Sequence, residues 1–539
     1  MSRSKQTIFF IIVIAMMSMT SSAQTWQWAN RAGGDQNDFA NGVAVDASGN
    51  SYVTGTFRDS ISFGTTHLVN HGAMSVFISK YDVTGTLIWA KIAATDSVIY
   101  VAGIDVSRSG SISITGQFSD TMTAGVANPV LLISGGDNDV FISNYDNNGD
   151  ILWAKSLGGP GIDYPGGISS DHDGNVYLTG DFHLSSFPFS GSKIFLAKYD
   201  SLGNNSWLRM ETSFDNNHFG NGIKTDANGN SYVTGEFFDT VRFGPSSTIG
   251  AGNVESNAFI AKFDSSGAMV WGQKAGSPSG YCGSKAIDID DAGNSYFTGY
   301  YKGTISLGPI NIVSASGNTY DVFVTKCDPF GNYEWANKSN GPGNARYINV
   351  DDFGDVFVSG TYSTTISFGP NVLISLGSTD IFIAETDPFG NFSGATSCGG
   401  TQADYVSGMD ASAAGLFLTG YFTDTIHFGN SISTVANSST ATDVFLAKMG
   451  IATIISEPAN AGNDLTCFPN PSAMEIEIRG GNENGDYSIY DDFGKIVRSG
   501  ALIAKNKFFI GDLPKGIYLL QLISQGIAGK RSWIKFVRE

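Results

Sequence analysis

An all-β fold, a seven-bladed β-propeller followed by a small β-sandwich, is predicted by three features of the sequence. Of 539 residues, 67 are glycine, 12% are aromatic and only 15% are charged, and no stretch carries the apolar spacing of a long amphipathic helix. Nearly the same twelve residues occur at positions 46–57 and 226–237. Strand-like segments also recur about every 60 residues, which is typical of repeat architectures.

The first 23 residues have the features of an export signal. Arg3 and Lys5 precede an apolar run over residues 8–19, and the small residues Ser21 to Ala23 follow. The apolar run is about a dozen residues long, short of the roughly 20 that a membrane-spanning helix needs. We therefore expect residues 1–23 to be cleaved, and we predict no membrane-spanning segment in the mature chain.

Residues 24–450 contain two anchors that repeat seven times. The first is a strand that ends in Gly-x-aromatic, and the second is an alternating strand around a central phenylalanine. The glycines are Gly55, Gly116, Gly180, Gly235, Gly299, Gly360 and Gly420, and the phenylalanines are Phe77, Phe141, Phe195, Phe259, Phe323, Phe382 and Phe445. Period-two alternation packs one face of a strand, so we expect these phenylalanines in the core.

A third anchor, a tryptophan in the last strand of each repeat, indicates how the ring closes. It occurs at Trp28, Trp89, Trp153, Trp207, Trp271 and Trp335. Asp-x-x-Gly turns, in which the aspartate accepts from the turn backbone and glycine supplies the positive φ, separate the strands. The seventh repeat lacks its last strand, whereas the chain begins with a surplus one. We predict that the strand around Trp28 completes the seventh blade, as radial closure requires.

These anchors resemble a known family of repeats. The pattern from Trp28-Ala29 through the Gly-x-aromatic and Asp-Val-Phe strands is similar to SBBP-type seven-bladed β-propeller repeats of bacterial exported proteins, and it covers residues 26–450. The resemblance implies the fold but little about a ligand, because propellers host many functions.

The tail is a separate domain. A linker over residues 451–465 precedes alternating strands over 466–539, which predict a β-sandwich. This segment resembles the type A C-terminal sorting domain of type IX secretion, and the matching residues are Phe468, Pro469, Asn470, Pro471, Gly516 and Tyr518. The resemblance implies the type IX secretion machinery as a partner and a protein that is secreted or anchored to the outer-membrane surface. The alternative is a permanent carbohydrate-binding or stalk module.

The charge and the absence of common catalytic motifs argue against several classes of function. The net charge is −19, and because residues 1–23 and 466–539 each carry +2, residues 24–465 carry −23. A field of that sign repels phosphate backbones, so we expect no nucleic-acid partner. The six histidines are scattered without metal-ligand spacing, and neither a nucleophile elbow nor a P-loop occurs. We therefore predict no catalytic residue, metal or cofactor, although a paired-carboxylate glycosidase site stays open.

Ligand-binding candidates lie where the repeats differ, in the loops that lead into each inner strand. They are Asp38, Phe39, Tyr100, Asp163, Tyr164, His218, Phe219, Arg346, Asp404 and Tyr405. We expect these residues around one mouth of a central channel, where aromatic, acidic and amide groups suit a sugar. The alternative is that the aromatic rings pack between blades.

Three functions are compatible with the sequence. The first is a non-enzymatic binding or adhesion scaffold for glycan or protein, displayed on or released from the cell surface. The second is a secreted polysaccharide-active enzyme that uses the channel mouth, and the third is a structural surface-layer component.

Overall fold

The structure is a computed structural model. It describes residues 25–70, 72–96, 99–184, 191–211, 218–243, 248–250, 256–276, 280–315, 319–429, 432–438, 441–450, 466–468, 475–479, 484–490, 496–503, 507–510, 513, 516–524 and 531–538. The predicted export signal, the linker and the sorting-motif residues Pro469, Asn470 and Pro471 lie outside the described residues.

The chain forms two compact units, and the larger one, Thr25–Ile451, is a β-propeller. Its first repeat is an antiparallel meander of β2 (Phe39–Val45), β3 (Ser51–Phe57), β6 (Met74–Tyr81) and β7 (Leu87–Asp96). Alternating apolar residues separated by Asp-x-x-Gly turns produce this meander, because each turn reverses the chain onto its neighbour. In the first turn Asp46 Oδ1 accepts from the Ser48 and Asn50 amides at 2.9 Å, and Gly49 has a φ of +78°.

The same meander recurs along the chain. Its members are β8 (Ile99–Val106), β9 (Ile112–Ala124), β10 (Val130–Tyr145) and β11 (Ile151–Leu157); β12 (Asp163–Ser170), β13 (Val176–Leu184), β14 (Gly191–Tyr199) and β15 (Asn205–Met210); β16 (Phe219–Thr225), β17 (Ser231–Phe237), β20 (Asn257–Phe263) and β21 (Met269–Gly276); β22 (Tyr281–Ile289), β23 (Ser295–Lys302), β26 (Asp321–Cys327) and β27 (Tyr333–Pro342); β28 (Asn344–Val350), β29 (Val356–Tyr362), β32 (Asp380–Thr386) and β33 (Phe392–Gly399).

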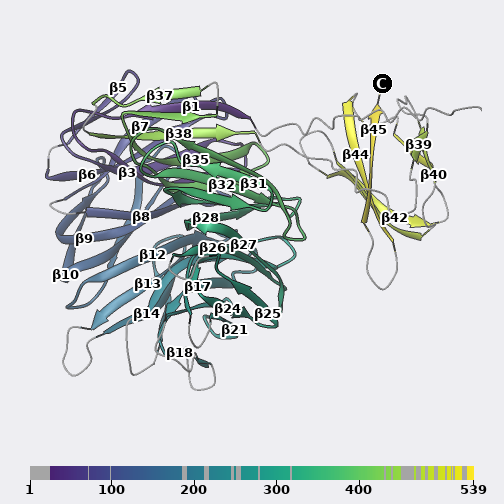
Figure 1. Cartoon of the computed structure of the whole chain (residues 1–539). Helices are drawn as coiled ribbons and strands as arrows, with labels where there is room; N and C mark the ends of the chain where they lie inside the picture. Colours follow the sequence, from purple (N-terminus) through teal and green to yellow (C-terminus); the bar gives the residue numbers. More distant parts are fainter. Residues whose placement is uncertain are drawn as a thin grey trace, which may run out of the picture. The chain divides into compact units, whose positions relative to one another are not determined.

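The two ends of the propeller meet in one sheet. The last three strands, β34 (Asp404–Ser412), β35 (Gly415–Thr423) and β38 (Thr442–Met449), are joined on their outer side by β1 (Trp26–Ala32). In this antiparallel pair Trp28 lies opposite Lys448, and Arg31 lies opposite Phe445. Figure 1 shows β1, in purple, beside β38, in green. The surplus first strand thus occupies the place that the seventh repeat leaves empty.

Hydrogen bonding does not divide the strands into seven separate sheets. The described propeller strands instead form sheets of four, eight, four, six, six and six members and two separate hairpins, β4 (Ser60–Phe63) with β5 (Thr66–Val69) and β18 (Thr240–Arg242) with β19 (Thr248–Gly250). Short hairpins in some repeats extend the outer edge of the preceding sheet. They are β24 (Thr304–Leu307) with β25 (Ile310–Val313), β30 (Thr365–Phe368) with β31 (Asn371–Ile374), and β36 (Thr425–Phe428) with β37 (Ile432–Val435). In addition β9 pairs with β7, which fuses the first two repeats.

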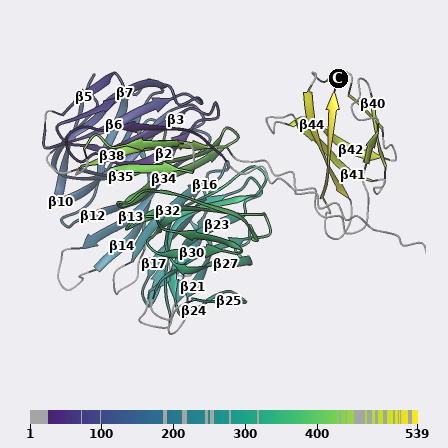
Figure 2. The same ribbon diagram turned by 45° about the horizontal axis from the view of Figure 1, so that its top comes forward.

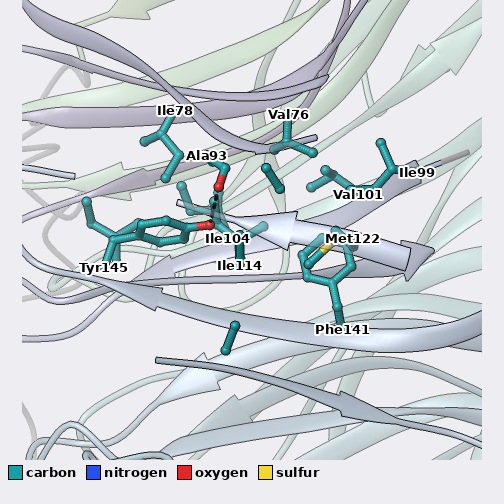
Figure 3. Close-up of a cluster of buried hydrophobic side chains, with 14 of the residues drawn as sticks. Val76, Ile78, Ala93, Ile99, Val101, Ile104, Ile114, Met122, Phe141 and Tyr145 are labelled. Carbon is teal, nitrogen blue, oxygen red and sulfur yellow. Dashed lines mark hydrogen bonds between the residues drawn. The ribbon is translucent and has the colours of Figure 1, made fainter. Parts of the chain in front are cut away.

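The core lies between neighbouring sheets. All seven repeated phenylalanines, Phe77, Phe141, Phe195, Phe259, Phe323, Phe382 and Phe445, are fully buried. Figure 3 shows one such cluster, in which Tyr145 donates its hydroxyl to the Ala93 carbonyl at 3.0 Å among aliphatic side chains of the first two repeats. The apolar face predicted from the alternation is therefore the face that neighbouring repeats share.

The repeated tryptophans join each repeat to the next. The turn glycine of the following repeat lies over each indole, so that a Cβ there would be 2.5 to 3.0 Å from a ring carbon; the pairs are Trp28 with Gly85, Trp89 with Gly149, Trp153 with Gly203, Trp207 with Gly267, Trp271 with Gly331 and Trp335 with Gly390. The indole N–H of Trp271 also donates to the Pro329 carbonyl of that turn at 3.0 Å. A tryptophan and a glycine thus form a clasp at six junctions.

The tail unit contains two antiparallel sheets. The first pairs β39 (Thr466–Phe468), β40 (Glu475–Arg479) and β43 (Lys507–Phe509), and the second pairs β42 (Ile496–Ile503), β41 (Asn484–Tyr490), β44 (Gly516–Ser524) and β45 (Arg531–Arg538). Of the motif residues, Phe468 ends β39, Gly516 begins β44, and Tyr518 is buried.

Two further findings concern the described residues. Cys282, Cys327 and Cys398 are buried free thiols. In the part of the chain that the structure describes, no helix has the length and apolarity to cross a membrane.

Candidate functional site: the central channel

The first strand of each repeat lines a central channel. These inner strands are β2, β8, β12, β16, β22, β28 and β34, each of which packs against the next, and β34 packs against β2. Figure 2 shows β2 and β34 side by side at this closure. The strands enclose a cavity of about 350 Å³. We call the end where the inner strands begin the upper mouth and the opposite end the lower mouth.

Every inner strand carries a β-bulge near its start. The register shifts lie at equivalent positions, and the extra residues are Asn41, Ala102, Gly166 with Gly167, Asn221, Lys285, Arg346 and Ser407. A bulge re-aims the side chain it inserts. Consistently, Asn41, Asn221, Lys285 and Arg346 line the channel. We call this set the bulge tier.

A second polar tier lies toward the lower mouth. Seven residues at one register position, two before the following turn, form it: Ala44, Asp105, Ser169, Lys224, Asp288, Asn349 and Asp410. Lys224 Nζ lies 3.1 Å from Asp288 Oδ1. Because Asp288, Asp410 and Asp105 surround this ammonium, its pKa is raised above the ordinary value.

The lower tier also links neighbouring inner strands. Asp105, Asp288 and Asp410 each accept the backbone N–H of a residue on the next strand, Ser170 at 2.7 Å, Val350 at 3.0 Å and Val45 at 2.7 Å. Desolvation by burial raises the pKa of Asp410 to about 7, against the opposing effect of Lys224. This tier therefore links the inner strands on either side of the ring closure through a half-buried charge network.

The predicted acidic residues do not line the channel. Asp38, Asp163 and Asp404 have no exposed surface. One oxygen of each accepts the N–H of a glycine four residues earlier, at 2.6 to 2.7 Å. Desolvation raises the pKa of Asp38 to about 8, of Asp163 to about 6 and of Asp404 to about 8. These carboxyl groups therefore hold the loops that connect one repeat to the next.

His218 is also enclosed by protein. It is fully buried, with Nδ1 2.8 Å from Glu211 Oε1 and Nε2 3.0 Å from the Phe238 carbonyl. Both ring nitrogens are therefore occupied. In the part of the chain that the structure describes, no group of three or more His, Cys, Asp or Glu side chains could hold a metal ion.

The predicted aromatic residues have mixed environments. Tyr100 and Tyr164 are 55% and 43% exposed, and Tyr100 lines the channel. Phe39 and Tyr405 instead pack on the half-buried Tyr421, with ring centroids 5.0 and 5.1 Å away. Of the ten predicted residues, Tyr100 and Arg346 are those that line the channel.

A cluster that the sequence did not single out lies beside the upper mouth. Buried Glu236 accepts from Lys285 Nζ at 2.7 Å and from the hydroxyls of Tyr281 and Tyr300 at 3.2 Å. Asp181 is also buried, and Lys285 acts on it electrostatically; its pKa is raised to about 8, chiefly by desolvation, and its Oδ2 lies 3.6 Å from His183 Nδ1. The sequence could have indicated these two residues, because Asp181 and Glu236 are the two acidic residues at the middle position of the seven Gly-x-aromatic motifs.

Comparison with known proteins supports the sequence-based resemblance. Residues 466–535 match the model of the secretion system C-terminal sorting domain, and residues 27–56 and 152–181 match that of the β-propeller repeat. The sorting domain marks proteins that are secreted through the type IX system and then attached to the cell surface or released. The chain is accordingly a secreted or surface protein.

Whole-chain similarities are weak. An uncharacterized WD repeat-containing protein of Acanthamoeba polyphaga mimivirus is 23% identical over 439 residues, covering 63% of this chain but only 31% of the viral protein. A Dyadobacter fermentans protein of unknown function superposes with a TM-score of 0.37 and 11% identity, covering 79% of this chain and 98% of its own. A Xanthomonas campestris gluconolactonase gives 0.30 and 15%, covering 60% and 84%. None of these similarities bears on function.

Proposed function

We propose that this chain is a non-enzymatic binding scaffold outside the cell and that its ligand, a glycan, contacts the upper mouth of the channel. The observation that carries the proposal is Tyr100, an aromatic side chain 55% exposed at the rim of the cavity. Ligand sites are concave and lined by aromatic side chains with a few placed polar groups, and the exposed ring of Tyr100 can pack on the apolar face of a sugar.

The proposal includes the architecture on which the mouth depends. We infer seven blades, with β1 as the outer strand of the last, because seven inner strands contact one another in sequence around the channel. The fused hydrogen bonding arises at outer edges and leaves this inner ring unchanged. For the tail we infer a β-sandwich, since its two antiparallel sheets have three and four strands.

Binding is tested on a glycan array with the mature chain. Tyr100→Ala should reduce retention of bound glycans at least tenfold, whereas the control Phe389→Ala, which removes an aromatic side chain 79% exposed in an outer turn, should leave it unchanged. An equal response of the two variants, or no binding by the unaltered chain, contradicts the proposal. Concentration-dependent self-association without glycan binding would favour a surface-layer component.

Polysaccharide cleavage is a second candidate, favoured by Asp181. Desolvation raises the pKa of this buried carboxyl group to about 8, so it keeps its proton at neutral pH and can act as a general acid. The test is release of new reducing ends from polysaccharides. Loss of that release in Asp181→Asn with binding retained would establish the enzyme and overturn the scaffold.

The export route is tested separately. A chain truncated after Ile451 lacks the sorting-domain match, so we expect it to accumulate in the periplasm of a type IX-competent host while the full chain leaves the cell. Equal export of the two chains would contradict the assignment of the tail.

A further inference from the structure

Three cations line the channel, and they differ in how they are compensated. Lys224 lies 3.1 Å from Asp288, and Lys285 lies 2.7 Å from Glu236. Arg346, the bulge residue of β28, is exposed and has neither a hydrogen bond nor an ion pair with any residue that the structure describes. Its guanidinium is therefore free to meet a ligand.

The position of Arg346 is set by its strand. It is the inserted residue between Ala345, opposite Gly360, and Tyr347, opposite Ser359, so the bulge turns it out of the sheet toward the channel. Most bulge-tier positions are small or amide residues, and the two cations occupy neighbouring strands, β22 and β28. Because Glu236 compensates Lys285, Arg346 carries the uncompensated positive charge on this side of the upper mouth, as far as the structure describes the chain.

Tyrosines from other strands lie within electrostatic range of this guanidinium. Arg346 and Tyr100 both act electrostatically on the half-buried Tyr347 and Tyr421, whose pKa values are raised mainly by desolvation. Tyr100 comes from β8, which is separated from β28 around the ring by β2 and β34. Tyr100 and Arg346 nevertheless line the same cavity, so one ligand there can meet both side chains.

An uncompensated hydrogen-bond acceptor lies in the same tier. Asn41, the bulge residue of β2, lines the channel, and its Oδ1 has no hydrogen-bond partner among the described residues. This oxygen is buried, so a sugar hydroxyl would satisfy it after a small movement of the side chain toward the channel. Guanidinium, aromatic rings and an amide oxygen together match a ring that carries hydroxyls and one negative group.

We infer that the upper mouth binds a uronic acid residue of an acidic glycan, with the carboxylate on Arg346 and the sugar ring against Tyr100. This inference rests on the proposed binding function and names its ligand class. A planar fork of N–H donors pairs with a planar carboxylate through two parallel hydrogen bonds, which lysine cannot reproduce. The net negative propeller would repel such a polymer at a distance, so recognition depends on this local cation.

The test is calorimetric titration of the mature chain with uronate tetramers prepared from polygalacturonate, alginate and glucuronan, each paired with its carboxyl-reduced counterpart. We expect at least one uronate tetramer to bind ten or more times more tightly than its reduced form. Arg346→Gln should remove that difference, and Arg346→Lys should restore it only in part. The matched control Arg108→Gln, which removes an exposed charge in the turn after β8 near the lower mouth, should change nothing.

The outcomes separate this inference from the proposed function. Equal affinity for charged and reduced tetramers, or uronate binding unaffected by Arg346→Gln, would overturn the carboxylate site while the glycan scaffold stands. Binding of a sulfated neutral tetramer without any uronate binding would overturn the assignment of a carboxylate. Failure of every tetramer, charged or neutral, to bind would overturn both.

Discussion

The clasp between repeats leads to a quantitative prediction about two glycines. Gly331 and Gly64 both have positive φ, +86° and +63°, so alanine at either position costs about 1–2 kcal/mol of backbone strain. A Cβ at Gly64 meets nothing within 4 Å, whereas a Cβ at Gly331 would lie 2.8 Å from the Trp271 ring. Gly331→Ala must therefore also displace an indole across a junction.

The expected loss of stability in Gly331→Ala depends on the packing and the hydrogen bond of the Trp271 indole. Displacing a packed ring costs about 1–3 kcal/mol, and the lost Trp271 hydrogen bond to the Pro329 carbonyl costs about 1 kcal/mol more. We expect Gly331→Ala to lower the free energy of unfolding by about 3–6 kcal/mol and Gly64→Ala by about 1–2 kcal/mol.

Urea unfolding followed by tryptophan fluorescence measures both free energies. With an unfolding entropy of about 2.1 cal/mol/K per residue, a unit of this size loses about 1 °C of Tm per kcal/mol, so the chemical denaturation is the more sensitive assay. Equal losses in the two variants would refute the clasp, because backbone strain alone would then account for both.

Three further predictions concern buried charges. The folded pKa of Asp404 is about 8 against an ordinary 3.8, so the folded state binds the extra proton, and Asp404 should make stability fall as pH rises from 4 to 8 by up to ~1.4 kcal/mol per pH unit. In urea titrations Asp404→Asn should reduce the slope of stability against pH by that amount, while the contributions of Asp38 and Asp181 remain. An unchanged slope would contradict the assignment. Lys224→Met should raise the pKa of Asp410 above about 7, as measured by carboxyl-carbon NMR, because a compensating cation is lost; an unchanged value would show that Lys224 does not act on it. Arg31→Met should lower the free energy of unfolding by about 2–3 kcal/mol, because it leaves the fully buried Asp443 without the guanidinium at 3.1 Å. Adding Asp443→Asn should restore most of that free energy. No restoration would show that the loss does not come from the unpaired Asp443.

The sequence predicted those parts of the fold in which the repeats have the same residues at equivalent positions. The central phenylalanines, such as Phe77 and Phe445, are in the core because alternation fixes one packed face, and the strand around Trp28 pairs where a strand was missing. The fused sheets were not predictable, because pairing between outer hairpins depends on how neighbouring repeats approach in space.

The channel chemistry was harder to predict. Asp38 and Asp404 were placed at a mouth because they occur in loops, but the distinction between a solvent-facing acid and a buried clamp depends on tertiary packing. Arg346 was found because it departs from the repeat. The lower tier was missed, although aligning the repeats two residues before each inner turn would have brought Asp105, Lys224 and Asp410 together.

The seam between β1 and β38 has a consequence for how the chain matures. The Gly450 amide donates to the Thr25 carbonyl at 3.0 Å, so the earliest and latest residues of the propeller are hydrogen-bonded neighbours. During synthesis and translocation, β1 has no strand to pair with until more than 400 further residues, up to β38, have followed it. The β1–β38 pair can therefore form only after the whole propeller has been synthesised. Circular permutants in which the chain ends lie at another Asp-x-x-Gly turn should change the folding rate more than the free energy of unfolding.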